Sequence, residues 1–434
     1  MRFPGLPRAI SHFLYPGIKL KRWFFLLLLS AVIFSFGLGG MMGKALKGYR
    51  FHIEPLRKVE KQVRDYFTSL RSMDQWLVVL GGVGILFAIR RGYYAILTVF
   101  VPGRENRFGR MAFERARRRR GPRVVLIGGG TGLPNLLVGM RDYSDNLSAI
   151  VTVADDGGSS GRLRKQFHML PPGDIRNCLV ALADTEPLIG KLFQHRFGAR
   201  DGDLKGHAFG NLFLAAMAEV TGDFSRAIAE SSKVLAVRGR VIPVTLDLVT
   251  LGARLKNGKT VRGESKLALA GSPIERLHLI PAKVKPNPDA IQALAQAEII
   301  VFTPGSLYSS VVPNLLVPGI RQAVNAARGL KVYASNIMTE PGETDGFSAA
   351  DHLEIVHSYL GGVVDAVVVN NEEAPTAMID RYRRDGAFPV AADLDRLRQM
   401  GVRVRASRLI NMKEGYIRHD AVRLAKAVMR LAII

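Results

Sequence analysis

A single cysteine, Cys178, stands in this 434-residue sequence, within the apolar run IRNCLVAL. One cysteine excludes a disulfide within the chain and any metal centre built from several thiolates, so we expect Cys178 to be buried packing. Three catalytic signatures are also missing: HExxH, Gly-x-Ser-x-Gly, and a Walker lysine after a glycine-rich loop. The sequence therefore gives no support for zinc-protease, serine-hydrolase or P-loop chemistry, and it names no catalytic base.

Acidic residues are scarce in the first 123 residues, which hold 24 Lys and Arg against 6 Asp and Glu, a net charge of +18. The rest of the chain contributes only +6 to the total of +24. So high a total is typical of nucleic-acid binding. The excess nevertheless lies beside hydrophobic runs, where membrane proteins carry basic cytoplasmic flanks. We therefore expect no nucleic-acid partner, with binding through the arginine tract as the minor alternative.

The first hydrophobic run, residues 23–43, has 21 residues without a charge and follows a basic, acid-free segment at 1–22. A helix of that length crosses the hydrocarbon core of a bilayer. A secretory signal peptide is the rival interpretation, but the run is long for one and no clear small-residue cleavage site closes it. The pattern favours a transmembrane helix.

A second hydrophobic run covers residues 76–101 and is interrupted by Arg90 and Arg91. Either the helix extends to Val101 and both arginines snorkel or face something polar, or it ends near Arg91 and the arginines form its flank. The connecting residues 44–73 place apolar side chains at helical spacing. That spacing indicates an amphipathic helix or, alternatively, a short soluble connector.

An arginine-rich linker at 102–121 follows the second run, and such a tract suits contact with anionic lipid headgroups. Residues 1–22 hold 5 basic residues and Arg90 to Arg123 hold 11, together twice the 8 in the loop at 44–73. Basic flanks mark the cytoplasmic side. We therefore predict an inner-membrane protein with two helices, about 23–43 and 76–101, whose amino terminus and large domain lie in the cytoplasm.

Residues 122–434 alternate between strand-like and helical patterns, which predicts an α/β domain with a mostly parallel, Rossmann-like sheet and helices on both faces. Residues 241–265 differ, because a period of two around Asn257-Gly258 predicts a β-hairpin with a type I′ turn. The expected strands cover 124–127, 149–153, 299–302, 331–335 and 365–369, and the expected helices cover 133–143, 175–184, 211–219, 224–235, 289–296, 319–328 and 349–360.

Small-residue loops follow the first two predicted strands. Glycines let backbone N–H groups approach an anion, and the helix that follows presents its positive end. The second loop adds two carboxylates, which suit a sugar hydroxyl or a Mg²⁺ ion that bridges phosphates. A tight turn without a ligand is the alternative for each. The candidate residues are Gly128, Gly129, Gly130, Thr131 and Gly132 in the first loop, and Asp155, Asp156, Gly157, Gly158, Ser159 and Ser160 in the second.

Two further segments lie at predicted helix starts. In PPGDIRN, Asp174 is a natural N-cap, while Arg176 and Asn177 extend polar groups toward the same edge. His207 and Asn211 lie in GHAFGN, and His207 is either a base or ligand contact, or a structural histidine. The basic Arg162, Arg164 and Lys165 also follow the second loop and can meet phosphate.

Three later strands end in similar loops, which contribute Gly305 and Ser306, Asn336, and Asn370. Because parallel strands place their carboxyl ends at one edge of a sheet, all five loops are expected to share that edge. One such loop would be weak evidence. Five of them predict a nucleotide-like binding cleft.

Seven segments resemble the YvcK-type gluconeogenesis factor family, in the superfamily of CofD, the 2-phospho-L-lactate transferase. The resemblance runs from about residue 122 to at least 371. Its motifs are long and follow one another in order. They are GGGTGL (128–133), VADDGGSSGRLR (153–164), LPPGDIRNCLVAL (170–182), GHAFGNL (206–212), TPGSLYSSVVPNLLV (303–317), NIMTEPGET (336–344) and VVVNN (367–371).

The resemblance implies a Rossmann-like fold that binds UDP-sugars, UDP-N-acetylglucosamine especially, and a role in cell shape and envelope growth under gluconeogenic conditions. It implies a regulatory protein without turnover of its own, anchored here by an N-terminal region that typical soluble members lack. Relatives on the CofD side transfer a phospholactyl group with Mg²⁺, so a transferase with Mg²⁺ at Asp155 and Asp156 is the alternative. A homo-oligomer and cell-envelope protein partners stay open.

Overall fold

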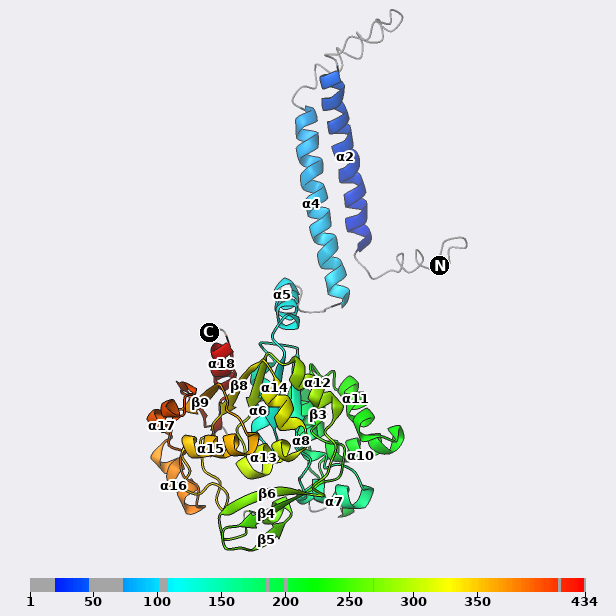
Figure 1. Ribbon diagram of the computed structural model, residues 1–434. Coiled ribbons are helices and arrows are strands. Elements are labelled where there is room, and N and C mark those ends of the chain that lie inside the picture. Colours follow the sequence, from blue (N-terminus) through cyan, green and yellow to red (C-terminus); the bar gives the residue numbers. More distant parts are fainter. Residues whose placement is uncertain are drawn as a thin grey trace, which may run out of the picture. The chain divides into compact units, whose positions relative to one another are not determined.

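The computed structural model describes residues 20–46, 73–100, 108–184, 187–198, 202–267, 269–412 and 415–432 (Figure 1). The contacts divide the chain into two compact units, Met1–Glu114 and Arg115–Ile434. Residues 1–19 of the basic N-terminal segment, and all but the ends of the amphipathic helix expected at 44–73, lie outside the described residues.

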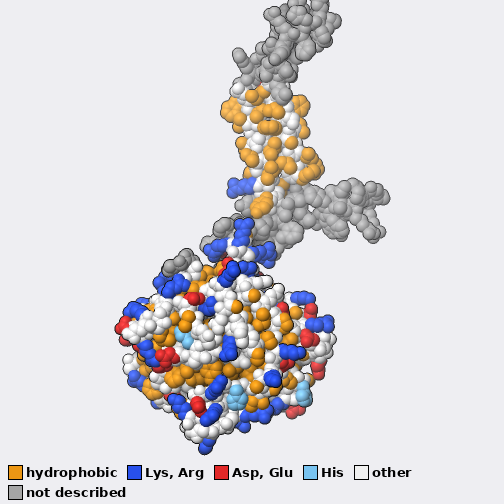
Figure 2. Space-filling view, in the orientation of Figure 1, with side chains coloured by type: hydrophobic (Ala, Val, Ile, Leu, Met, Phe, Trp, Pro, Cys, Tyr) orange, Lys and Arg blue, Asp and Glu red, His pale blue; other side chains and the backbone are white. Residues whose placement is uncertain are grey.

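The N-terminal unit contains two long helices, α2 (Leu20–Leu46) and α4 (Met73–Phe100). Both are long and apolar enough to cross a membrane by length and composition, over Arg22–Met41 and Met73–Tyr93. Figure 2 shows hydrophobic side chains over much of the visible surface of both helices. Such exposed apolar surface is unusual for a helix in water.

Helix α4 continues through both arginines to Phe100, whereas its candidate span covers Met73–Tyr93, so the point where a membrane crossing would end stays a prediction. The guanidinium of Arg91 lies 5.7 Å from the ring centre of Trp23 and 5.4 Å from that of Phe87. Aromatic faces attract a cation electrostatically. Arg91 is exposed, and the two rings therefore give it favourable neighbours on the surface of the helix pair.

Glycines bring α2 and α4 close together. A Cβ atom at Gly81 would lie 2.6 Å from the backbone nitrogen of Phe34, and one at Gly84 would lie 2.3 Å from Ser30 Oγ. Neither position admits a side chain without movement of its neighbour. Small residues at a helix contact are the usual means of close packing in a bilayer.

The predicted arginine-rich linker contains a helix, α5 (Phe108–Arg119), whose last turn holds Arg117, Arg118 and Arg119. Cations at a helix C-terminus interact favourably with its partial negative charge.

The main sheet of the C-terminal unit has seven parallel strands in the order β10-β9-β8-β7-β1-β2-β3. All five predicted strands are confirmed to within two residues, whereas β3 and β10 were not assigned as such. The strands are β1 (Val124–Gly128), β2 (Leu147–Val151), β3 (Arg240–Pro243), β7 (Ile299–Phe302), β8 (Leu330–Ala334), β9 (Ala366–Asn370) and β10 (Arg403–Ser407).

Helices cover both faces of this sheet, as predicted. Successive strand residues point to opposite faces, so Val124 and Leu126 join one core and Val125 and Ile127 the other. The first face carries α6 (Gly132–Met140), α8 (Gly173–Leu182), α9 (Pro187–Gln194), α10 (Phe209–Thr221), α11 (Phe224–Val234) and α18 (Ala421–Ala432). The second carries α12 (Pro288–Gln296), α13 (Val312–Leu316), α14 (Ile320–Ala326), α15 (Ala349–Leu360) and α17 (Leu394–Gln399).

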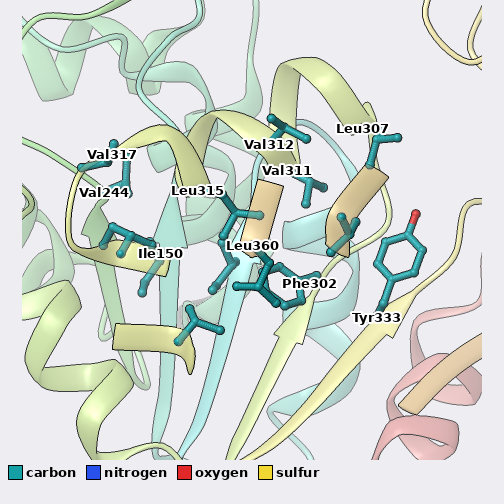
Figure 3. Close-up of a cluster of buried hydrophobic side chains, with 14 of the residues drawn as sticks. Ile150, Val244, Phe302, Leu307, Val311, Val312, Leu315, Val317, Tyr333 and Leu360 are labelled. Atoms are coloured by element: carbon teal, nitrogen blue, oxygen red, sulfur yellow. The ribbon is translucent and has the colours of Figure 1, made fainter. Parts of the chain in front are cut away.

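The second core holds the loop after β7 in place. Phe302 at the end of β7, and Leu307 and Val311 just beyond it, are buried together with Leu315 of α13 (Figure 3). Cys178, as expected, is buried in the first core. Helices α7 (Gly158–Phe167) and α16 (Thr376–Arg384) are not among the helices assigned above to either face of the sheet. The short antiparallel pair β11 (Ile410–Asn411) and β12 (Arg418–His419) is also separate from the main sheet.

A small antiparallel sheet, in the order β5-β4-β6, accounts for the predicted hairpin. It contains β4 (Thr250–Leu255), β5 (Thr260–Arg262) and β6 (Ile274–Ile280). The hairpin at Asn257-Gly258 is confirmed, but Val241 belongs to β3 in the main sheet instead. The type I′ assignment is also wrong, because Gly258 has a positive φ of 83° and Asn257 does not, whereas that turn needs both.

Candidate functional site

The strand order reverses beside β1. The chain builds outward from β1 to β2 and β3, then returns to place β7 on the other side of β1. In open α/β sheets, ligands bind outside the carboxyl ends of the strands at such a switch point. All five predicted loops leave parallel strands and therefore share this edge, as expected, and the loops after β1 and β7 lie at the reversal itself.

The glycines after β1 are required by contact with the loop after β7. A Cβ at Gly132 would lie 1.7 Å from the carbonyl oxygen of Pro304, and one at Gly128 would lie 2.0 Å from Thr303 Oγ1. Gly130 adopts φ +59°, which favours glycine. Helix α6 begins at Gly132, and its N-cap residue Thr131 makes no side-chain capping bond. The two loops are thus fitted to each other, with a helix N-terminus at their junction.

Asp174 was expected to cap a helix, and that prediction is wrong. Helix α8 begins at Gly173, and Pro172 is its N-cap. Asp174 Oδ2 instead accepts a hydrogen bond of 2.8 Å from the backbone amide of Gly130. Burial raises the pKa of Asp174 to about 6, the amide bond lowers it, and the charge of Asp155 raises it further.

The second glycine loop is shorter than predicted, because α7 begins at Gly158. Gly158, Ser159 and Ser160 form the first turn of that helix, with Gly157 as N-cap. Before it, Asp155 Oδ1 accepts a 2.8 Å hydrogen bond from the amide of Gly157. Asp156 Oδ1 accepts one of 3.0 Å from the amide of Ser265. Asp155 therefore shapes the loop itself, and Asp156 connects the loop with the segment that follows β5.

Glu264 is a site residue that the sequence did not reveal. It lies in a short turn, Glu264–Lys266, after β5. Burial, and after it the charges of Asp155 and Asp174, together raise its pKa to about 9, although a hydrogen bond with Ser309 acts in the opposite direction. Its Oε2 is enclosed and has no hydrogen-bond partner among the described residues. Glu264 is thus protonated near neutral pH. Its approach to the aspartates depends on how the small sheet folds over the strand ends.

Within the described residues, no group of three or more His, Cys, Asp or Glu side chains is arranged to hold a metal ion. Asp155 and Asp156 each use one carboxylate oxygen on a backbone amide and keep the second oxygen. Mg²⁺ takes one or two carboxylates and completes its shell with water and phosphate oxygens. These two residues therefore fit a phosphate-bridging Mg²⁺, and they do not form a closed protein site.

A second group of predicted residues meets at the starts of α7 and α10. Ser159 Oγ lies 3.1 Å from His207 Nδ1 and accepts a 3.0 Å hydrogen bond from Asn211 Nδ2. Burial, then the charges of Arg162 and Arg196, lower the pKa of His207, so the imidazole is neutral at pH 7.

Arg176 and Asn177 lie in α8 beside this group, and Arg176 Nη2 donates a 2.7 Å hydrogen bond to Asn177 Oδ1. Arg164, by contrast, donates to the carbonyl of Val249 and to Thr250 Oγ1, which ties α7 to β4.

Hydrogen bonds join the loop after β7 to the loop after β8. Asn336 and Gly305 exchange two hydrogen bonds, of 3.0 Å and 2.8 Å, across the ends of β8 and β7. Ser306 Oγ donates a 2.9 Å bond to Glu343 Oε2. Asn370 is the last residue of β9, and its side chain bonds the backbone of Glu372 and Leu409. Within the part of the chain that the structure describes, no hydrogen bond joins the Asn370 side chain to the other candidate residues.

A cavity of about 1150 Å³ lies beside the strand-end loops, between β6 and the helices α13, α14 and α15. No residue of the two glycine loops lines it. It adjoins the site through Tyr308, which follows β7, and through Glu343, the partner of Ser306. Figure 2 shows a band of hydrophobic side chains on the visible face at the level of α13 and α15. Burial and the neighbouring Glu340 raise the pKa of Glu343 to about 7.

A parallel sheet with helices on both faces, and with fitted glycine loops at its switch point, defines a Rossmann-like α/β protein. Residues 124–410 match the family model described as 2-phospho-L-lactate transferase CofD. The gluconeogenesis factor of Bacillus subtilis is 46% identical over 311 residues, which cover 71% of this chain and 98% of that one. The chain belongs to the CofD family, in its YvcK-type gluconeogenesis factor branch.

A relative from Nostoc of similar description is 43% identical over 428 residues, 96% of this chain and 91% of its own. That similarity extends into the N-terminal region, whereas the match to the Bacillus subtilis protein covers 71% of this chain. The crystal structure of protein BH3568 from Bacillus halodurans superimposes with a TM-score of 0.69 at 45% identity, covering 71% of this chain and 99% of that one.

Proposed function

We propose that this chain is a membrane-anchored regulatory protein that binds a UDP-sugar, UDP-N-acetylglucosamine or a close analogue, at the switch point of its sheet. Through that ligand it adjusts cell shape and envelope growth under gluconeogenic conditions. The observation that carries the proposal is the fit between the loops after β1 and β7, where Gly132 and Gly128 allow contact with Pro304 and Thr303. Rossmann-like sheets bind nucleotides at this position.

The chemistry of the edge suits a sugar nucleotide. Carboxylates such as Asp155 and Asp156 accept hydrogen bonds from ribose or sugar hydroxyls, while helix N-termini and arginines favour phosphate oxygens. The adjoining cavity of about 1150 Å³ exceeds the usual size of a small-molecule pocket, which is roughly 300–1,000 Å³. There is thus room for the remainder of a bulky ligand.

The ligand test uses the full chain in detergent. UDP-N-acetylglucosamine should raise its unfolding temperature, and above the Kd the rise should follow the logarithm of ligand concentration, because the ligand binds only the folded state. GDP serves as the comparison nucleotide. After incubation the sugar nucleotide should be recovered intact by chromatography, since the proposal assigns no turnover.

Anchoring in the inner membrane is part of the same proposal, with α2 and α4 as the two spans and the C-terminal unit in the cytoplasm. Supporting it are the apolar surfaces of the two helices and the arginines that follow them in α5. Alkaline carbonate should leave the full chain in the membrane fraction, and a variant lacking residues 1–101 should leave that fraction. Carbonate extraction of the full chain would contradict the anchor.

A CofD-like transferase is the second candidate, favoured by the family model and by the carboxylate oxygens that Asp155 and Asp156 retain. Asp155 and Asp156 would hold a Mg²⁺ that neutralises charge on a nucleotide-linked phospho-donor. Product formed from such a donor with Mg²⁺, and lost in Asp156→Asn but kept in Lys165→Met, would establish this function over the first.

A further inference from the structure

Arg176 is a buried cation without a counter-ion. Its side chain is 6% exposed. Apart from the bond from Nη2 to Asn177, its Nε and Nη1 have no hydrogen-bond partner in the described part of the chain. Burial, and after it the charge of Arg196, together lower the pKa of Arg176 to about 10. Asp174 is the carboxylate that acts on it, but no ion pair joins the two. A buried charge is costly unless it is paired, so an anion is the partner it lacks.

Three helices begin around this side chain: α7 at Gly158, α8 at Gly173 and α10 at Phe209. None of their N-cap residues makes a side-chain capping bond. The hydrogen bond between Ser159 and Asn211 joins the first turns of α7 and α10. A Cβ at Gly210 would lie 2.8 Å from Cγ and Cδ of Arg176, so that glycine admits the arginine stem. Helix N-termini carry partial positive charge and unpaired N–H groups.

Two further guanidinium groups stand at the rim. Arg162 Nη2 donates to the carbonyl of Lys205 at 2.7 Å, and Arg196 Nη1 donates to that of Gly206 at 2.6 Å. No carboxylate pairs with either arginine among the described residues. Their charges reach His207, whose pKa they lower. Asn211 is 2% exposed, and its Oδ1 also has no partner in the described chain.

The glycine loop after β1 offers a poorer place for negative charge. The amide of Gly130 is already bonded to Asp174. Beside the effect of burial, the charges of Asp155 and Asp156 raise the pKa of Glu264, so the three carboxyl groups lie near one another. The strand-end edge therefore has an acidic half at the β2 and β5 loops and a basic half at the starts of α7, α8 and α10.

We propose that the basic half, here called the Arg176 pocket (Ser159, Arg162, Arg176, Arg196, His207 and Asn211), binds a phosphate group. Phosphate matches guanidinium and helix N-termini in charge and hydrogen-bond geometry. The phosphate belongs either to the sugar nucleotide of the proposed function or to a separate phosphorylated metabolite. In either case the acidic half faces hydroxyls or a cation.

The test titrates the full chain in detergent with inorganic pyrophosphate by calorimetry. Arg176→Met keeps the length of the side chain and removes the charge, and it should weaken pyrophosphate binding by roughly tenfold or more. The ligand-free variant should unfold at a temperature no lower than wild type, because an unpaired buried charge has been removed. Lys259→Met, at an exposed position in the turn between β4 and β5, controls for the change in net charge and should bind as wild type does.

A second variant tests the same pocket while Arg176 stays in place. Asn211→Asp adds a negative charge to the first turn of α10, whose Gly210 packs on the Arg176 stem, so it should weaken pyrophosphate binding through repulsion. Unchanged pyrophosphate binding in both variants would overturn the pocket. So would a crystal structure in which water satisfies Nε and Nη1 and soaked pyrophosphate leaves the pocket empty.

UDP-N-acetylglucosamine distinguishes the two sources of phosphate. If its affinity falls in Arg176→Met together with that of pyrophosphate, the pocket holds the diphosphate of the nucleotide. If its affinity is unchanged while pyrophosphate binding is lost, the pocket holds a separate phosphorylated ligand. Pyrophosphate binding that depends on Arg176, without binding of any uridine nucleotide sugar, would uphold the pocket and defeat the proposed function.

Discussion

The carboxylate of Asp174 accepts a hydrogen bond of 2.8 Å from the backbone amide of Gly130, in the middle of the glycine loop. A residue of α8 therefore occupies one of the amides that a glycine loop would ordinarily offer to a phosphate. The loop is held in shape by the protein itself. This places phosphate recognition elsewhere on the edge and gives Asp174 a structural task that can be tested.

Substitutions of Asp174 should separate its hydrogen bond from its charge. Asp174→Asn keeps an acceptor for Gly130 and should be at least as stable as wild type at pH 7. The reason is that a folded pKa of about 6, raised from 3.8, makes wild-type stability fall as the pH rises between about 4 and 6. Asp174→Ala leaves the amide unpaired and should cost about 1–3 kcal/mol in free energy of unfolding. Equal stability of the two variants in thermal or denaturant unfolding would exclude this role.

Glu264 should make the free energy of unfolding fall as the pH rises. Its folded pKa of about 9 lies above 4.5, so folding retains a proton that the unfolded chain releases above about pH 4.5. Stability from this group is therefore complete below pH 4.5 and declines up to about pH 9, by at most about 1.4 kcal/mol per unit. Glu264→Gln mimics the protonated acid and should gain on wild type as the pH rises from 5.5 to 8.5.

The control for Glu264 is Glu275→Gln on the exposed surface of β6, which also removes one carboxylate. Melting temperatures of wild type and both variants at three pH values are sufficient. A constant difference between wild type and Glu264→Gln across that range would show that Glu264 is ionised in the folded protein.

The fit of the two loops at the switch point should make Gly132 intolerant of any side chain. In Gly132→Ala the new methyl group would meet the carbonyl of Pro304 at 1.7 Å, so the loops must separate. Overpacking of this kind costs about 1–3 kcal/mol in free energy of unfolding. Gly157→Ala is the matched control, since its Cβ would meet its nearest neighbour, Asp155 Oδ1, at 3.4 Å. Equal melting temperatures for the two variants would refute the loop contact.

The close approach of α2 and α4 can be tested by cross-linking. A Cβ at Gly84 would lie 3.0 Å from the Cβ of Ser30, and a small outward shift would bring the pair to the separation in a disulfide, about 3.5–4.5 Å. The double variant Ser30→Cys with Gly84→Cys should therefore form an internal disulfide under mild oxidation, detected by mass spectrometry of the digested protein. The pair Gly39→Cys with Gly84→Cys should not, because the Gly39 position has no neighbour within 4 Å. Cys178 is buried and does not interfere.

Much of the fold was predictable because buried parallel strands are short apolar runs that end in polar loops. The five runs from 124 to 369 and their order in the chain were sufficient to predict a parallel sheet with helices on both faces. Strand β10 escaped notice because its sequence, RVRAS, is an edge strand with exposed arginines. Val241 and its neighbours were assigned to the hairpin because their alternation continues directly into β4.

The site was predictable only in part. Glycines and polar residues after strands identify an edge, since that depends on local sequence and strand direction. Helix α7 was not predicted, because the glycines and serines at its start are typical of both loops and helix N-termini. Asp174 bonds an amide 44 residues away, and Glu264 reaches the aspartates only through the small sheet. Neither contact leaves a signal in the spacing of the sequence.

The central claim is that the switch point binds a UDP-sugar, and calorimetric titration of the full chain in detergent with UDP-N-acetylglucosamine tests it most directly. We predict a saturable heat with one ligand per chain, reduced in Gly132→Ala and retained in Gly190→Ala, where the new Cβ in α9 would meet its nearest neighbour at 4.0 Å. No measurable binding of UDP-N-acetylglucosamine or of any other uridine nucleotide sugar to folded wild-type protein would contradict it.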